Sequence, residues 1–256
     1  MNSRAEDAMR KREDISRFMV HLTRDDETEW PEGVGGTARK NFEEILDDGA
    51  IFPIKPHCLH GRLIRQWPQK VQDRFRVACF TETPLHQIKH LLNLPWRQVK
   101  LEPYGFVFER DFLYQKDAQP ATYINEYYGN KAQRNAFDRI FSIASKNSFS
   151  GLSWRVLPFV NVMHDGHDFA WEREWRVAGE VRFDLDDLVC VILPEYEGDL
   201  RGRMATKGIA AIDPDWGQER VVAELASQQR RTKQIWKDKL PKHGLKPKLK
   251  LAQAGA

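Results

Sequence analysis

The sequence predicts an α+β domain. Segments with strand and helix patterns follow one another without the regular strand–helix–strand alternation that a parallel α/β sheet requires. The chain of 256 residues is long enough to bury a substantial core, and it contains no internal repeats. Its apolar residues, 41% of the total, and its charged residues, 30%, have the balance of a folded globular protein.

Net charge, cysteine content and hydropathy indicate the cellular compartment in which we expect the protein. The formal net charge is only +3, so affinity for polyanions has to come from local patches. The three cysteines are an odd number at irregular spacing and do not make a disulfide framework. No apolar run approaches the length of a membrane span, and residues 1–14 lack the apolar core of a signal peptide. We therefore expect a cytoplasmic protein without membrane contact.

The predicted domain covers residues 15–215, after a charged, flexible arm at residues 1–14. Residues 15–23 have the pattern of a strand. Residues 37–48 have the pattern of an amphipathic helix, which Gly49 ends. A second strand is predicted at residues 74–80.

A helix start follows this second strand, in the segment Thr81-Glu-Thr-Pro-Leu85. Thr83 is a favoured N-cap residue, and Pro84 suits the first helical position. Residues 81–83 are therefore expected at a strand-to-helix junction, where free backbone N–H groups favour anions. The helix is continued by an apolar stripe at Leu85, Ile88, Leu91 and Leu92.

The second half of the chain continues the mixture of strands and helices. The strand at 156–162 is expected to form a hairpin with the strand at 171–177, across a turn at 164–167. The uninterrupted apolar run at 188–193 is typical of a buried strand. A C-terminal helix and basic tail form a separate segment at 216–256. The other expected elements are strands at 104–108 and 121–125, a short segment at 210–213, and helices at 131–145 and 218–240.

One late strand carries an unusual set of charges. Read as a strand, the stretch 169–177 places Glu172, Glu174 and Arg176 on one face and two tryptophans on the other. Acids are poor strand formers, so their presence needs a reason. The pattern favours a solvated face with an ion pair, and it also fits a cleft floor where a carboxylate meets a substrate. The strand pattern leaves both interpretations open.

Metal and glycine-loop motifs are weak. The segment His57-Cys58-Leu-His60, with Cys79, His86 and His90, offers zinc ligands but lacks the paired knuckles of structural zinc, so no metal is expected. The sequence has no P-loop, no dinucleotide-binding glycine motif and no serine-hydrolase elbow. A glycine loop for phosphate and a Ser-His-Asp hydrolase are therefore not indicated.

Positive charge gathers near the C-terminus of an otherwise balanced chain. Such a run attracts phosphate backbones through counterion release, although a solvated tail explains it as well. The candidate nucleic-acid-binding residues are Arg230, Arg231, Lys233 and Lys237, and five further lysines follow them. A nucleic acid is thus a candidate partner.

Three segments together resemble a known family. They are His21-Leu-Thr-Arg24, Cys79-Phe-Thr-Glu-Thr-Pro-Leu85, and Trp171-Glu-Arg-Glu-Trp-Arg176 followed by the apolar strand at 189–193. In this order they are similar to abortive-infection proteins of the AbiGi type, which are described as antitoxins. More distantly the layout resembles the ADP-ribosyltransferases, including the DarT-type toxins that modify nucleic acid. The resemblance covers most of residues 15–195 and implies an ADP-ribosyltransferase-like mixed β core of two packed sheets with flanking helices.

The transferase resemblance implies a set of NAD-binding residues. His21 and Thr23 would hold the NAD ribose, and Arg24 or alternatively Arg176 would hold the pyrophosphate. Thr81 and Thr83 would support the nicotinamide side and orient the catalytic acid. Thr-Glu-Thr stands in place of the family's simpler Ser/Thr pattern.

The resemblance also implies the catalytic acids. Glu174 would be the carboxylate that stabilises the oxocarbenium charge on the ribose, and Glu172 would take a proton from the incoming nucleophile. Tyr104 is the candidate ring for stacking on the nicotinamide. The aromatic residue that the family carries after its first motif is not obvious in this chain.

Structural explanations exist for each of these residues. His21 fits a buried structural histidine, Thr83 a helix cap, Tyr104 strand packing, and Glu174 a cross-sheet ion pair. The functional interpretation rests on a polar residue at the end of each of three strands. It requires His21 and Glu174 to line one cleft.

Three functions follow from these observations. The first is an ADP-ribosyltransferase that uses NAD as substrate, without a metal, and modifies a nucleic acid or protein in phage defence or a toxin–antitoxin system. The second is a non-enzymatic antitoxin or interaction module that binds a cognate protein. The third is a metal-dependent nuclease with Glu172 and Glu174 as ligands.

Overall fold

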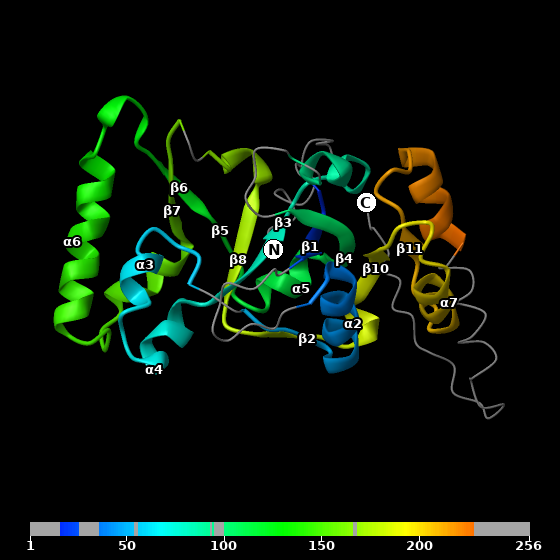
Figure 1. The fold of residues 1–256 in the computed structure, drawn as a ribbon, viewed down its shortest axis with the longest axis horizontal. Coiled ribbons are helices and arrows are strands. Elements are labelled where there is room, and N and C mark those ends of the chain that lie inside the picture. Colours follow the sequence, from blue (N-terminus) through cyan, green and yellow to red (C-terminus); the bar gives the residue numbers. More distant parts are fainter. Residues whose placement is uncertain are drawn as a thin grey trace, which may run out of the picture.

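A seven-stranded sheet forms the centre of the molecule (Figure 1). Its strand order is β11-β10-β4-β1-β3-β8-β5, and only β10 and β11 are parallel neighbours. This computed structural model describes residues 16–25, 36–53, 56–92, 94, 100–165 and 168–227. The strands are β1 (Phe18–Arg24), β3 (Val77–Thr81), β4 (Leu101–Glu109), β5 (Gln119–Pro120), β8 (Glu174–Ala178), β10 (Leu188–Ile192) and β11 (Ala211–Ile212).

Two short ladders complete the β structure. The antiparallel pair is β2 (Ala50–Ile51) with β9 (Val181–Arg182), and the parallel pair is β6 (Thr122–Asn125) with β7 (Val160–Met163). Together with the flanking helices, they confirm the α+β class. The resemblance implied a core of two packed sheets. The described strands instead form one seven-stranded sheet and two two-stranded ladders.

The helices are short apart from two. The α-helices are α2 (Ala38–Asp48), α3 (Gly61–Ile64), α4 (Gln69–Gln72), α5 (Arg110–Tyr114), α6 (Ala132–Lys146) and α7 (Gly198–Thr206). The 3-10 helices are η1 (Asp73–Phe75), η2 (Leu85–Leu91), η3 (Tyr127–Gly129), η4 (Ser153–Phe159), η5 (Ala170–Glu172) and η6 (Leu185–Asp187). Residues 218–227 are also helical, and the rest of the helix predicted at 218–240 lies outside the described residues.

Helix α2 covers one face of the central sheet and forms as predicted. Thr37 caps its start by accepting a hydrogen bond from the Lys40 backbone N–H, and Gly49 ends it in the left-handed conformation at φ +61°. Its buried Phe42 stacks on Phe106 of β4, with ring centroids 4.6 Å apart. This face holds the largest apolar cluster of the domain.

Helix η2 contributes to the apolar cluster on the opposite face. Its leucines and Ile88 are buried in one cluster with Val20 and Val107, so the predicted apolar stripe is confirmed. The predicted cap is wrong. The helix begins at Leu85 with Pro84 at the cap position and no side-chain cap bond, and the segment winds as a 3-10 helix; the Thr83 hydroxyl instead bonds Thr81 Oγ1 at 2.8 Å.

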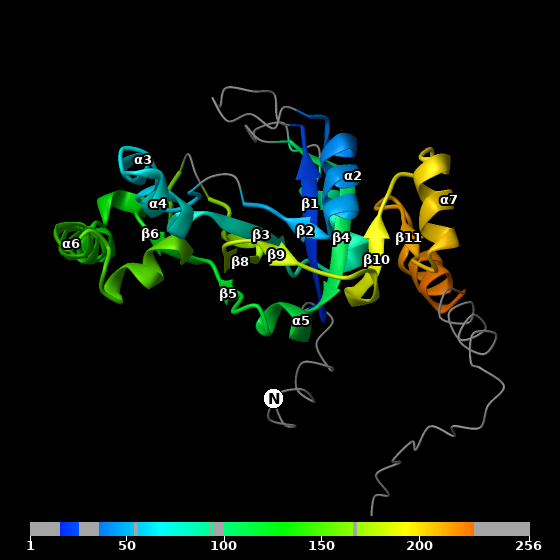
Figure 2. The ribbon, with the colours of Figure 1, turned by 90° about the horizontal axis from the view of Figure 1, so that it is seen from below.

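A second group of helices forms what we call the α6 lobe, residues 56–75 and 127–160. It contains α3, α4, η1, η3, α6 and η4 and has its own apolar core around Phe75, Phe149 and Leu157. Figure 1 places α6 at one end of the long axis and α7 at the other. Figure 2, seen from below, shows the same separation.

The predicted hairpin between 156–162 and 171–177 is wrong. Most of the first segment lies in η4, and β7 pairs with β6, while β8 pairs with β3 and β5. The second segment becomes a strand only at Glu174. Before it, η5 and the left-handed Arg173 at φ +50° break the extended backbone, beyond the last partner that β3 offers at Thr81. Glu172 therefore does not share a strand face with Glu174.

Candidate active site

The three segments that carry the family resemblance lie on neighbouring strands. Strand β1 pairs with β3, and β3 pairs with β8, although about 90 residues separate β3 from β8 in the sequence. In register, Val20 is opposite Thr81, and Thr81 is opposite Glu174. The fold thus brings the Thr-Glu-Thr motif directly beside the acid of β8.

The same register separates His21 from Glu174. Residues paired across a sheet point to the same face, so Val20, Thr81 and Glu174 share one face. His21 lies on the other face, where its ring is 5.6 Å from that of Phe80. The expectation that His21 and Glu174 line one cleft is therefore wrong. A residue one position from Val20 must point to the opposite side of a pleated strand.

Glu174 is held by the guanidinium of Arg176, two residues along the same strand face. Arg176 Nε donates to Glu174 Oε1 at 3.0 Å, and Nη2 donates to Oε2 at 2.8 Å. The remaining Nη1 donates to the Pro158 carbonyl oxygen of η4 at 2.9 Å. Arg176 is completely buried and Glu174 is 8% exposed. The pair therefore joins the central sheet to the α6 lobe.

Tyr123 of β6 completes the surroundings of this carboxylate. Its hydroxyl donates to Glu174 Oε2 at 2.7 Å, and burial together with the Glu174 charge raises the pKa of the tyrosine. Burial alone would raise the pKa of Glu174, but the charge and hydrogen bonds of Arg176 outweigh it and lower the pKa to about 2. Glu174 is consequently ionised at neutral pH.

Glu172 and the two threonines lie next to this cluster. Thr81 Oγ1 donates to the Glu172 carbonyl oxygen at 2.6 Å and accepts the Thr83 hydroxyl at 2.8 Å. The Glu172 charge also contributes to the raised pKa of Tyr123. A carboxylate of such low pKa is a poor proton acceptor, but it can accept hydrogen bonds and stabilise a nearby positive charge. In the described structure, Glu174 is thus an ionised hydrogen-bond acceptor whose charge is paired with Arg176.

The other predicted cofactor residues have structural partners. His21 Nδ1 donates to the Cys79 carbonyl oxygen at 2.9 Å, and burial lowers the pKa of His21 to about 4, so the ring is neutral. Thr23 donates to the Ala38 and Tyr104 carbonyl oxygens, which ties β1 to α2 and β4. The Tyr104 hydroxyl donates to Glu197 at 2.5 Å. The structure does not bring Thr23 or Tyr104 to Glu174, because both side chains form their hydrogen bonds on the face of the sheet that α2 covers.

Arg24 is the last residue of β1, and its positive charge affects the pKa values of His21 on β1 and Cys79 on β3. Its positive charge lowers the pKa of His21, after the larger effect of burial. Burial and the Glu174 charge raise the pKa of the Cys79 thiol, and the Arg24 charge lowers it by a smaller amount. Because β1 and β3 are antiparallel and Val20 is opposite Thr81, Arg24 at the end of β1 lies beside the start of β3, away from Thr81. The sequence interpretation placed the polar ends of the three strands together. In the structure these ends do not meet.

Sequence reasoning missed the role of Tyr123 and assigned Arg176 only as an alternative anion ligand. The spacing of Glu174 and Arg176, two residues apart on a strand, was a usable signal for an ion pair on one face. No local pattern points to Tyr123, because its hydroxyl reaches Glu174 only through packing of β6 against the sheet. The candidate nucleic-acid residues 230–237 lie outside the described residues.

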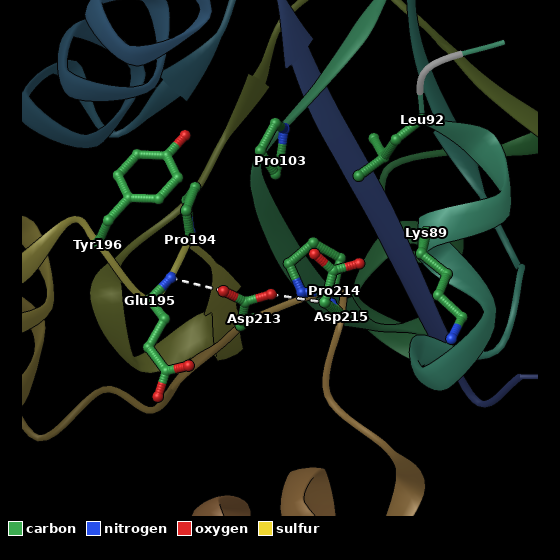
Figure 3. A pocket seen from close by; sticks show the side chains of 9 residues that line it. All are labelled: Lys89, Leu92, Pro103, Pro194, Glu195, Tyr196, Asp213, Pro214 and Asp215. Atoms are coloured by element: carbon green, nitrogen blue, oxygen red, sulfur yellow. Dashed lines mark hydrogen bonds between the residues drawn. The ribbon is translucent and has the colours of Figure 1, made fainter.

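A small pocket lies away from this site, at the ends of β10 and β11 (Figure 3). Its volume is about 170 Å³, below the roughly 300–1,000 Å³ of typical ligand sites. The Asp213 carboxylate at its wall accepts the backbone N–H groups of Glu195 and Asp215, so it serves the local turn. The pocket contains no residue of the predicted NAD site. Its lining is Lys89, Leu92, Pro103, Pro194, Glu195, Tyr196, Asp213, Pro214 and Asp215.

Two absences hold for the described part of the chain. It contains no group of three or more His, Cys, Asp or Glu side chains placed to hold a metal ion. None of its helices combines the length and apolar character needed to span a bilayer. Comparison of the chain with protein-family models, with curated proteins and with solved structures finds no match.

Acid should destabilise the protein in the range where Glu174 takes up a proton. Folding lowers its pKa from 4.5 to about 2, so the stabilisation is fully present above about pH 4.5 and is lost as the pH falls toward 2. The shift corresponds to on the order of 3 kcal/mol. Urea titrations across this range should show a steeper loss of stability for the wild type than for the double variant Glu174→Gln/Arg176→Met, which carries neither charge. Parallel pH profiles would contradict the assignment.

Proposed function

We propose that the protein is an ADP-ribosyltransferase that transfers ADP-ribose from NAD to a nucleic acid, as an effector of a bacterial phage-defence or toxin–antitoxin system. The observation that carries the proposal is the neighbouring placement of β1, β3 and β8, which hold the three segments of the family resemblance. The ionised Glu174 on the last of these strands supplies the charge that the reaction needs.

The chemistry assigns distinct roles to the two acids. The bond between nicotinamide and ribose C1 breaks, and nicotinamide leaves with the bonding electrons. Glu174 stabilises the positive charge that develops on the ribose and accepts a hydrogen bond from a ribose hydroxyl. A nucleophilic atom of the target then bonds to C1, and Glu172 takes the proton that this atom loses.

The proposal uses a revised set of supporting residues. Thr81 and Thr83 lie beside Glu172, and Tyr123 orients Glu174 from β6, next to the α6 lobe. Arg176 fixes the carboxylate and does not contact pyrophosphate in this scheme, because its buried guanidinium donates its three hydrogen bonds to Glu174 and to the Pro158 carbonyl oxygen. His21, Thr23 and Tyr104 support the scaffold. The proposal therefore gives up the requirement that His21 lines one cleft with Glu174, and it rests on the residues of β3, β6 and β8 around the two acids.

A second function is favoured by how completely Glu174 is bonded. Arg176 and Tyr123 occupy both carboxylate oxygens, and only 8% of the residue is exposed. A carboxylate with these partners also fits a core ion pair of a non-enzymatic module that binds a cognate toxin or antitoxin. The two functions differ in one measurable property, which is the consumption of NAD.

Label transfer from radioactive NAD tests the proposal. The full-length protein is incubated with labelled NAD and cellular RNA, single-stranded DNA or protein. We expect label on nucleic acid for the wild type and a decrease on the order of 100- to 1,000-fold for Glu174→Gln. Glu172→Gln, which leaves the buried ion pair intact, should also lose transfer.

The matched control is Glu180→Gln, which removes an exposed glutamate whose described partner is Arg182. It should keep wild-type transfer. Circular dichroism of each variant separates loss of chemistry from loss of fold. Absence of both label transfer and calorimetric NAD binding in the folded wild type would exclude the transferase and leave the interaction module.

A further inference from the structure

Charge is distributed unevenly over the described residues, although the net charge of the whole chain is only +3. The α6 lobe, residues 56–75 and 127–160, contains nine basic and two acidic residues. Residues 180–227, which include β10, β11 and α7, contain eleven acidic and five basic residues. Helices α6 and α7 lie at opposite ends of the long axis (Figure 1). Within the described residues, basic residues therefore outnumber acidic ones at the α6 end, and acidic residues outnumber basic ones in the segment that includes α7.

The outer side of α6 presents part of this positive charge. Phe137, Phe141 and Ala144 pack into the core of the lobe. Arg139 and Lys146 lie on the opposite side of the helix, seven residues apart, and are exposed. Lys131, just before the helix, is exposed as well.

The basic residues of the lobe are largely unneutralised. Its two acids are already engaged, since Asp138 bonds His60 and Arg134, and Asp73 pairs with Arg76. Within the described part of the chain, six exposed basic residues of the lobe have no acidic partner. They are Arg62, Lys70, Lys131, Arg139, Lys146 and Arg155.

We propose that the α6 lobe binds the phosphate backbone of a nucleic acid. Exposed Lys and Arg side chains without internal partners neutralise phosphates and release the counterions condensed on the strand, which makes binding favourable and salt-dependent. The exposed cations supply contacts that depend on charge and carry no base sequence information.

The lobe also contacts the candidate active site. Tyr123, on the strand next to the lobe, bonds Glu174, and Pro158 of η4 accepts a bond from Arg176. A nucleic acid bound to the lobe would therefore lie near the end of the sheet order that contains β8 and Glu174. In this respect the inference rests on the proposed function and names the surface that holds its target. Binding itself needs neither NAD nor Glu174.

Fluorescence anisotropy of labelled single-stranded RNA, single-stranded DNA and duplex DNA tests the inference, with full-length protein and no NAD. The test variant is Lys131→Gln/Arg139→Gln/Lys146→Gln, which changes exposed side chains only. We expect the wild type to bind with a dissociation constant that rises steeply with salt. The triple variant should bind on the order of 10-fold more weakly near physiological salt, with a slope smaller by about 2–3 on a log–log plot.

A control with the same loss of charge is Lys89→Gln/Lys116→Gln/Lys207→Gln, at exposed positions outside the lobe. It should bind within about twofold of the wild type, because phosphate contacts are local. Equal weakening by the two triple variants, or salt-independent binding, would overturn the proposal. So would a charge-dependent affinity for phosphatidylserine vesicles together with none for nucleic acid. Nucleic-acid binding without label transfer would leave the surface standing and remove only the transferase.

Discussion

Replacing Arg176 by methionine is expected to lower the free energy of unfolding by about 3–5 kcal/mol. Arg176 is 0% exposed; two of its hydrogen bonds go to Glu174 on the same strand, and the third, to the Pro158 carbonyl oxygen, links β8 to η4 of the α6 lobe. Its removal leaves the Glu174 charge buried without its partner, and this uncompensated charge is the main cost. Urea unfolding at neutral pH, followed by circular dichroism, measures the change.

The double variant Glu174→Gln/Arg176→Met is the control for this prediction. Glutamine keeps an acceptor for the Tyr123 hydroxyl but carries no charge. Because the second substitution removes the charge that the first one left unpaired, the double variant should be more stable than Arg176→Met. A double variant that is less stable than Arg176→Met would show that packing of the arginine, and not its charge, holds this part of the molecule.

Replacing Phe42 by alanine is expected to cost about 3–5 kcal/mol. Phe42 is 0% exposed and stacks on Phe106, with Tyr104 6.3 Å away. It packs in the apolar cluster between α2 and the central sheet, so its loss opens a cavity that the surrounding strands cannot close. Thermal and urea unfolding of the purified variant measure the effect.

Phe52→Ala is the matched control, because Phe52 has the same side chain but is 48% exposed. Its replacement should change the free energy of unfolding by less than about 1 kcal/mol. Similar losses in the two variants would mean that α2 is not held to the sheet by the Phe42 aromatic contact.

Local sequence patterns predicted most of the elements. Helix α2 was predictable because its N-cap Thr37 and its left-handed Gly49 act within a few residues of the chain. Strand β10 was predictable because a strand covered on both faces is apolar at every position. Strand β8 was only partly predictable, since the left-handed Arg173 that precedes it has no sequence signal comparable to a glycine.

The candidate site was predictable in its residue types more than in its geometry. Alternation correctly placed Glu174 and Arg176 on one strand face. Alternation along β8 gave no information about which side chains of β1 would lie on the face of the sheet that carries Glu174. That depended on the register of Val20 opposite Thr81, which put His21 on the other side of the sheet.

The sequence by itself determined the α+β class, the amphipathic helices and the presence of acids on a late strand, because these features depend on spacings within one element. Only the tertiary structure decided that β1, β3 and β8 are neighbours, that Glu174 is bonded to Tyr123 as well as Arg176, and that the α6 lobe concentrates positive charge. The physical reason is that strand order, register and the packing of distant segments depend on long-range contacts. A one-residue change in register reverses which side chains meet.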